Sequence, residues 1–133
     1  MAEFGSLGDL GMIHYNVWFN LRDGVHETEG LAIVRAFLYE LCDAGSIAGF
    51  CLLRNASVGA KTKLPRFQAL IEFHDDAQFQ AAFRDQAARG IHAGLHGRMI
   101  PIVSDFRAEL FEQIAVSAES VVTEPSLQYA CEI

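Results

Sequence analysis

Three histidines are the residues of this sequence best suited to acid–base chemistry. His14 lies in a segment rich in β-branched and aromatic residues, and His92 and His96 lie four positions apart in a short stretch that contains glycine. Because the unperturbed pKa of histidine is near physiological pH, such side chains can act as general acids or bases. We therefore predict that His14 is the general base and that His92 or His96 is the second acid–base group. The alternative for all three is a structural role, either hydrogen-bonded or in solvent.

The same histidines could in principle bind a metal ion, but the sequence offers few further ligands. A tetrahedral site needs three or four of them. The sequence also has no glycine-rich phosphate loop after a strand, no Walker-type lysine, no Cys–His nucleophile pair and no Gly-x-Ser-x-Gly elbow. We therefore expect no metal and no cofactor. The side chains that could complete a metal site are His14, Glu72, His74 and Asp75.

Polar and aromatic side chains that could position a substrate alternate along two predicted strands. Successive side chains of a strand point to opposite faces, so residues of the same parity share a face. A small-molecule pocket needs an aromatic wall and a few polar groups, and we predict that this set supplies them. The alternatives are a solvent-exposed face and an ion pair between Glu72 and Arg66. The predicted substrate-binding residues, on the face that also carries His14, are Asn16, Trp18, Gln68 and Glu72.

The elements that must position these residues follow the order β-α-β-β-α-β. Strands are expected at residues 12–20, 47–54, 66–74 and 99–103, and helices at 28–44 and 75–89. Two βαβ units in tandem predict an α+β domain of the ferredoxin-like kind, with a four-stranded antiparallel sheet and both helices on one face. A C-terminal helix is expected to begin at Ser104 or Asp105 and to carry Phe106, Leu110, Phe111 and Ile114.

The predicted sheet needs a partner to cover its second face. The predicted strands at 47–54 and 99–103 are apolar on both sides, a pattern expected where both faces are covered. A single chain would leave one of those faces in water, and large exposed apolar patches usually mark interfaces. We therefore predict a homodimer, a dimeric α/β barrel in which two sheets face each other and enclose the predicted site.

Length and charge narrow the class of protein. The 133 residues suit one domain, and we expect a flexible leader at 1–11, the barrel domain at 12–119 and a tail at 120–133. The net charge of −7 argues against nucleic-acid binding and against docking on an anionic membrane. No apolar run is long enough to span a bilayer, and the first eleven residues lack the features of a signal peptide. The expected location is the cytoplasm.

The element order, the histidine in the opening strand and the histidine pair after the second helix together resemble the stress-responsive dimeric α/β barrel (Dabb) domain family. The resemblance covers about residues 12–114, and a looser one extends to the antibiotic-biosynthesis monooxygenase-like barrels. It implies a homodimer with a pocket between sheet and helices in each subunit. The Dabb family includes polyketide cyclases that act without metal or cofactor, and many members without known activity. By this resemblance, His14 matches a catalytic histidine of the cyclases.

Two functional hypotheses follow. The first is a cofactor-free enzyme, cyclase-like or monooxygenase-like, that uses histidine acid–base chemistry on an aromatic or polyketide-like substrate. The second is a non-catalytic, stress-associated dimeric protein that binds a small molecule or has a vestigial pocket. The sequence leaves open whether the chain is an enzyme. A cavity shared by His14 and a loop histidine would favour the first hypothesis, and a filled cavity would favour the second.

Overall fold

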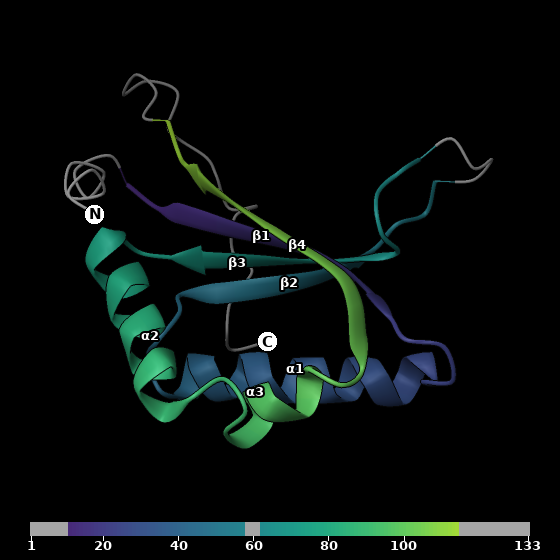
Figure 1. Cartoon of the computed structure of the whole chain (residues 1–133). Coiled ribbons are helices and arrows are strands. Elements are labelled where there is room, and N and C mark those ends of the chain that lie inside the picture. Colours follow the sequence, from purple (N-terminus) through teal and green to yellow (C-terminus); the bar gives the residue numbers. More distant parts are fainter. Residues whose placement is uncertain (1–10, 58–61, 115–133) are drawn as a thin grey trace.

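Three helices cover one face of a four-stranded antiparallel sheet (Figure 1). The computed structural model describes residues 11–57 and 62–114. The strands lie in the order β2-β3-β1-β4, so the first strand of the chain is central and pairs with β3 and β4. This confirms the α+β, ferredoxin-like fold class. The elements are β1 (Ile13–Leu21), α1 (Glu27–Asp43), β2 (Gly49–Arg54), β3 (Phe67–Phe73), α2 (Asp76–Arg89), α3 (Gly94–Met99) and β4 (Val103–Glu112).

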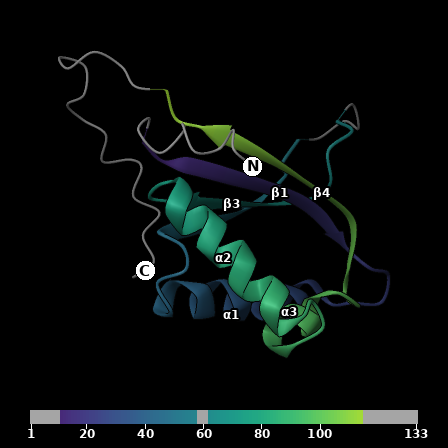
Figure 2. The same ribbon diagram turned by 60° about the vertical axis from the view of Figure 1, so that its left-hand side comes forward.

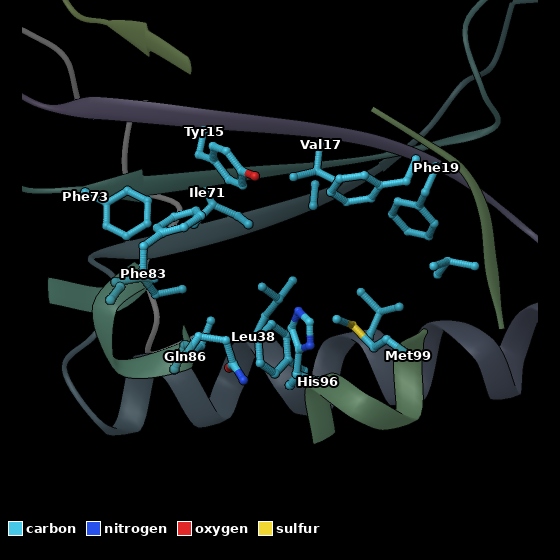
Figure 3. Close-up of a pocket in the computed structure, with 18 residues that line it drawn as sticks. Tyr15, Val17, Phe19, Leu38, Ile71, Phe73, Phe83, Gln86, His96 and Met99 are labelled. Atoms are coloured by element: carbon cyan, nitrogen blue, oxygen red, sulfur yellow. The ribbon is translucent and has the colours of Figure 1, made fainter. Parts of the chain in front are cut away.

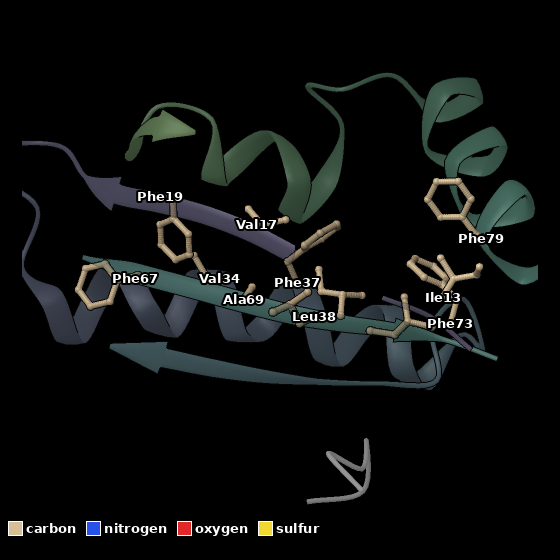
Figure 4. Close-up of a cluster of buried hydrophobic side chains, with 12 residues drawn as sticks. Ile13, Val17, Phe19, Val34, Phe37, Leu38, Phe67, Ala69, Phe73 and Phe79 are labelled. Carbon is tan, nitrogen blue, oxygen red and sulfur yellow. The ribbon is translucent and has the colours of Figure 1, made fainter. Parts of the chain in front are cut away.

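The hydrophobic core lies between the sheet and helix α1. Alternate residues of β1 and β3 point toward the helices, as their spacing predicted, and α1 presents an apolar stripe to them (Figure 4). Leu38 at the centre of α1 is 2% exposed, and Ile13 on β1 is 1% exposed. The buried members of this core that the close-up labels are Ile13, Val17, Phe19, Val34, Phe37, Leu38, Phe67, Ala69, Phe73 and Phe79.

Helix α2 begins at a reciprocal cap. The Asp75 carboxylate accepts a hydrogen bond from the Gln78 backbone N–H, and the Gln78 side chain accepts one from the His74 N–H. This arrangement satisfies N–H groups that the first turn of a helix leaves without partners. The helix ends at Gly90, whose φ of 97° favours glycine. Helices α1, α2 and α3 then lie on the same side of the sheet when the molecule is turned (Figure 2).

The C-terminal part of the described chain differs from the prediction. Residues expected to form the fourth strand at 99–103 instead end α3 at Met99 and form a turn, and the segment expected to begin the C-terminal helix is strand β4. Phe106 and Leu110 are four apart and fit helical spacing. However, Ala108 and Leu110 also fit the alternation of a strand, and pairing with β1 selects that alternative.

The predicted domain limits fall partly outside the described residues. The domain expected at 12–119 is described as far as residue 114, and of the expected leader only Gly11 is described. The expected tail at 120–133 also lies outside the described residues. None of the described helices is long and apolar enough to cross a membrane.

Candidate functional site

A mostly apolar cavity of about 200 Å³ lies between the sheet and the helices, and we call it the sheet–helix cavity (Figure 3). Strands β1 and β3 form its roof, α1 its floor, and α2, α3 and the start of β4 its ends. Three lining residues carry groups able to form hydrogen bonds with a ligand. They are Tyr15, Gln86 and His96.

His96 is held in one orientation at the wall of this cavity. Its Nδ1 lies 2.6 Å from the carbonyl oxygen of Ile91, and its ring packs edge-on against Phe37 with the centroids 5.4 Å apart. A carbonyl oxygen can only accept a hydrogen bond, so Nδ1 carries the proton and donates it. In the neutral ring, Nε2 is then an unprotonated acceptor. His96 is thus a fixed hydrogen-bond acceptor and a candidate base.

Tyr15 descends from the central strand toward the same cavity, with its hydroxyl directed into the interior (Figure 3). Its ring meets Phe83 edge-on at a centroid distance of 5.2 Å. Burial raises the pKa of Tyr15, because desolvation disfavours the phenolate. The hydroxyl therefore stays protonated at neutral pH and can donate or accept a hydrogen bond.

Gln86 contributes a polar group from helix α2. Its Nε2 donates to the carbonyl oxygen of Gly90 at 3.0 Å, which fixes the orientation of the amide. Its Oε1 is buried and has no hydrogen-bond partner among the described residues. Buried polar atoms usually have a partner, so this oxygen would be stabilised by a hydrogen-bond donor if a small movement of the side chain opened it to the cavity.

A β-bulge shapes the end of the cavity at β4. The register of β4 against β1 shifts between Trp18 and Asn20, which places one extra residue on β4. Asp105 accommodates this residue with a φ of 53°, and the Asn20 Nδ2 donates to its carboxylate at 2.9 Å. Val103 and Phe106 are three apart and would point to opposite faces of an uninterrupted strand. The bulge lets both of them line the cavity.

The predicted site residues of strands β1 and β3 lie on the opposite side of the sheet, which we call the outer face. The register of β1 against β3 pairs His14 with Glu72 and Trp18 with Gln68. The grouping of these residues on one face is therefore as expected. None of them lines the sheet–helix cavity. The outer-face set is His14, Asn16, Trp18, Gln68 and Glu72.

The two loop histidines differ in their exposure and in their contact with the cavity. His92 is exposed just before α3, while His96 within α3 lines the cavity. His14 and His96 thus stand on opposite faces of the sheet, and the expected cavity shared by His14 and a loop histidine is not present in the described chain.

Glu72 is the most buried ionisable group of the outer face, with 4% of its surface exposed. Burial raises the pKa of Glu72, and the charges of His14 and His74 oppose this effect. The Nδ1 of His14 lies 3.9 Å from the Glu72 Oε2, and its Nε2 lies 2.9 Å from the Gln113 Oε1. The alternative ion pair between Glu72 and Arg66 does not form among the described residues, where the basic side chain within 4 Å of the Glu72 carboxylate is that of His14.

Sequence reasoning missed two residues of the cavity. Tyr15 shares the helix-facing side of β1 with the core residues Val17 and Phe19, so its position in the sequence predicts only a core residue. Gln86 gave a clearer signal, because it lies four residues after Ala82 and seven after Phe79, within the apolar stripe of α2. No group of acidic, cysteine or histidine side chains within residues 11–57 and 62–114 could hold a metal ion.

The element order and sheet topology define an α+β protein with a ferredoxin-like fold. A Dabb-family protein from Mesorhizobium loti is similar in structure, with 22% identity, coverage of 79% of this chain and 99% of that chain, and a TM-score of 0.56. A hypothetical protein of Arabidopsis thaliana shows 11% identity, coverage of 80% and 92%, and a TM-score of 0.59. A dimeric ferredoxin-like protein of unknown function from Thermobifida fusca shows 19% identity, coverage of 77% and 92%, and a TM-score of 0.51.

These likenesses confirm the expected resemblance at the level of the fold. The profile of a family of unknown function, DUF6614, matches residues 12–121, and the chain belongs to that family. No curated protein matches the chain.

Proposed function

We propose that the protein binds a small, largely apolar molecule in the sheet–helix cavity and that His96 is the acid–base group of that site. The observation that carries this proposal is the hydrogen bond from His96 Nδ1 to the Ile91 carbonyl. It leaves Nε2 as an oriented acceptor at the wall of an apolar cavity, and such cavities with a few placed polar groups are typical ligand sites.

The size of the cavity limits the ligand. Sites for drug-sized ligands occupy about 300–1,000 Å³. The sheet–helix cavity, at about 200 Å³, suits a molecule of one or two rings. Phe106 and Phe83 line the cavity and are 60% and 43% exposed, so they form the part of its wall nearest to solvent.

A cofactor-free reaction of the cyclase-like or monooxygenase-like kind is the catalytic form of this proposal. His96 would remove a proton from the substrate, and the neutral hydroxyl of Tyr15 would donate a hydrogen bond to the oxygen where negative charge develops. In this proposal His96, which the sequence predicted as a candidate for the second acid–base group beside His92, becomes the base in place of His14, and Tyr15 is the second polar group. The alternative is a stress-associated binding protein that holds the same ligand without turnover.

We also propose a homodimer that forms through the outer face. This face carries Leu53, which is 42% exposed, and Phe111, which is 46% exposed. Between them lies Trp18, whose indole Nε1 is buried without a hydrogen-bond partner among the described residues. Apart from Phe111, strand β4 places charged residues on this face, because Arg107 and Glu109 alternate with Ala108 and Leu110, so β4 is not apolar on both sides as expected of the fourth strand. Dimers are known for the similar protein of Thermobifida fusca.

The solution mass tests the dimer. We expect a mass of two chains by light scattering and a shift toward one chain in Leu53→Lys. Leu64 is equally exposed, at 45%, but lies outside the sheet, so Leu64→Lys is the matched control and should remain dimeric. A wild-type chain that is monomeric at high concentration would contradict the dimer.

Ligand binding is tested with 1-naphthol, a two-ring probe, by titration calorimetry. Ala82 lines the cavity from α2, so Ala82→Phe should fill it and abolish binding, and Ala82→Leu should weaken binding. Ala88 is exposed on the same helix, and Ala88→Phe should bind as the wild type does. Equal binding by the wild type and by both Ala82 variants would exclude the cavity as the site.

A further inference from the structure

We infer that the sheet–helix cavity selects an uncharged ligand that carries a hydrogen-bond donor, such as a hydroxyl or an N–H group. The inference rests on the proposed function, because it names the chemical class of the molecule that the cavity would hold. It follows from the orientation of two side chains, His96 and Gln86, and from the absence of charge on the described residues of the cavity wall.

Both side chains present an acceptor. The Ile91 carbonyl takes the Nδ1 proton of His96, so the neutral ring offers Nε2 as a lone pair. The Gly90 carbonyl takes an amide hydrogen of Gln86, and the Gln86 Oε1 is left buried without a partner among the described residues. In each side chain a backbone carbonyl accepts a hydrogen bond from one nitrogen, and this fixes the position of the other polar atom, which can only accept.

A ligand that supplies a donor therefore gains more than its apolar contacts. Leaving a buried acceptor without a partner costs the desolvation free energy of that group. A ligand of the same shape without a donor would cover the His96 Nε2 and leave both acceptors unsatisfied. The cost corresponds to roughly a tenfold difference in Kd for one acceptor.

The cavity also disfavours anions. Of the described residues that line it, none is a lysine, arginine, aspartate or glutamate. Tyr15, the remaining polar residue, can give one hydrogen bond to a ligand. A carboxylate placed there would lose its hydration and meet no permanently charged cation, which is costly in an apolar surrounding. Size, donor and charge together give the expected ligand: small, neutral and hydroxylated or N–H bearing.

Three probes that share the naphthalene ring system separate these requirements. 1-Naphthol is neutral and has a donor, 1-methoxynaphthalene is neutral without a donor, and 1-naphthoate is an anion. We expect 1-naphthol to bind the wild-type protein about tenfold more tightly than 1-methoxynaphthalene. We expect 1-naphthoate to bind more weakly than both at neutral pH. Equal affinities for the two neutral probes, or tighter binding of the anion, would overturn the inference.

Two variants assign the acceptor. His96→Phe keeps an aromatic ring beside Phe37 and removes Nε2, while Gln86→Met keeps the length of the side chain and removes Oε1. If the ratio of the 1-naphthol affinity to the 1-methoxynaphthalene affinity falls toward one in either variant, the result supports the inference and assigns the acceptor to that residue. A ratio that both variants leave unchanged overturns it.

The outcomes for the proposed function are distinct. If neither neutral probe binds the wild-type protein, the proposed function fails together with the inference. If both bind with equal affinity and Ala82→Phe abolishes both, the cavity is a ligand site and only the selection by donor is wrong. The wild-type comparison needs no variant, so it stands even where a substitution prevents folding.

Discussion

The β-bulge at Asp105 gives a quantitative test of how the end of the sheet–helix cavity is built. Asp105 holds a φ of 53°, a region that costs an L-residue about 1–2 kcal/mol and glycine almost nothing. Its carboxylate also accepts a hydrogen bond from Asn20 at 2.9 Å, and a typical net value for such a bond is about 1 kcal/mol. These two contributions can be separated by replacing Asp105 with alanine in one variant and with glycine in another.

Asp105→Ala loses the hydrogen bond and keeps the unfavourable φ, so we expect it to lower the free energy of unfolding by about 1–2 kcal/mol. Asp105→Gly loses the same hydrogen bond but relieves the backbone, so we expect it to remain within about 1 kcal/mol of the wild type and above Asp105→Ala. Urea denaturation followed by circular dichroism measures both. An alanine variant as stable as the glycine variant, or more stable, would refute the left-handed backbone at this bulge.

Three further predictions address the rest of the described chain. Burial raises the pKa of Glu72, so the stabilisation that comes from its protonated carboxyl is complete below the ordinary glutamate pKa of 4.5 and is lost as pH rises through the raised pKa. In urea titrations the wild type should therefore lose stability relative to Glu72→Gln between acid and neutral pH. A difference in the free energy of unfolding that stays constant with pH would contradict the raised pKa. Leu38→Ala should cost about 2–5 kcal/mol in the same assay, since Leu38 is 2% exposed. His96→Ala should lower the free energy of unfolding by about 1–2 kcal/mol, because it loses the hydrogen bond to Ile91 and the contact with Phe37. His92 is exposed, so His92→Ala should stay within about 0.5 kcal/mol of the wild type. Equal effects of the two variants would contradict the fixed orientation of the His96 ring.

The sequence predicted those parts of the fold in which only one periodicity fits. In β1, apolar Ile13, Val17 and Phe19 alternate with polar residues, and strand pairing follows that pattern. At the C-terminal end, Phe106 and Leu110 fit both a helix and a strand. The choice there depends on an available edge of β1, a partner 80 or more residues away in sequence, which no local pattern reveals.

The candidate site was harder to predict for a different physical reason. The sequence pattern placed the predicted pocket on the polar face of the sheet, because functional groups are polar. The cavity instead lies on the apolar face, where packing of α1, α2 and α3 leaves a space between helices and sheet. The volume left by packing is a property of the whole fold. His96 was identified by its residue type, and Gln86 could have been identified as a polar residue in an apolar stripe.

The most direct test of the central claim is a two-dimensional NMR titration of methionine-methyl-labelled and ¹⁵N-labelled protein with 1-naphthol. Met99 lines the sheet–helix cavity, Met12 does not, and Trp18 is the single tryptophan and lies on the outer face. We expect the Met99 methyl resonance to shift with ligand and the Met12 methyl and Trp18 indole N–H resonances to remain unchanged. Shifts of the Trp18 and Met12 resonances with an unchanged Met99 would place the ligand on the outer face and contradict the account.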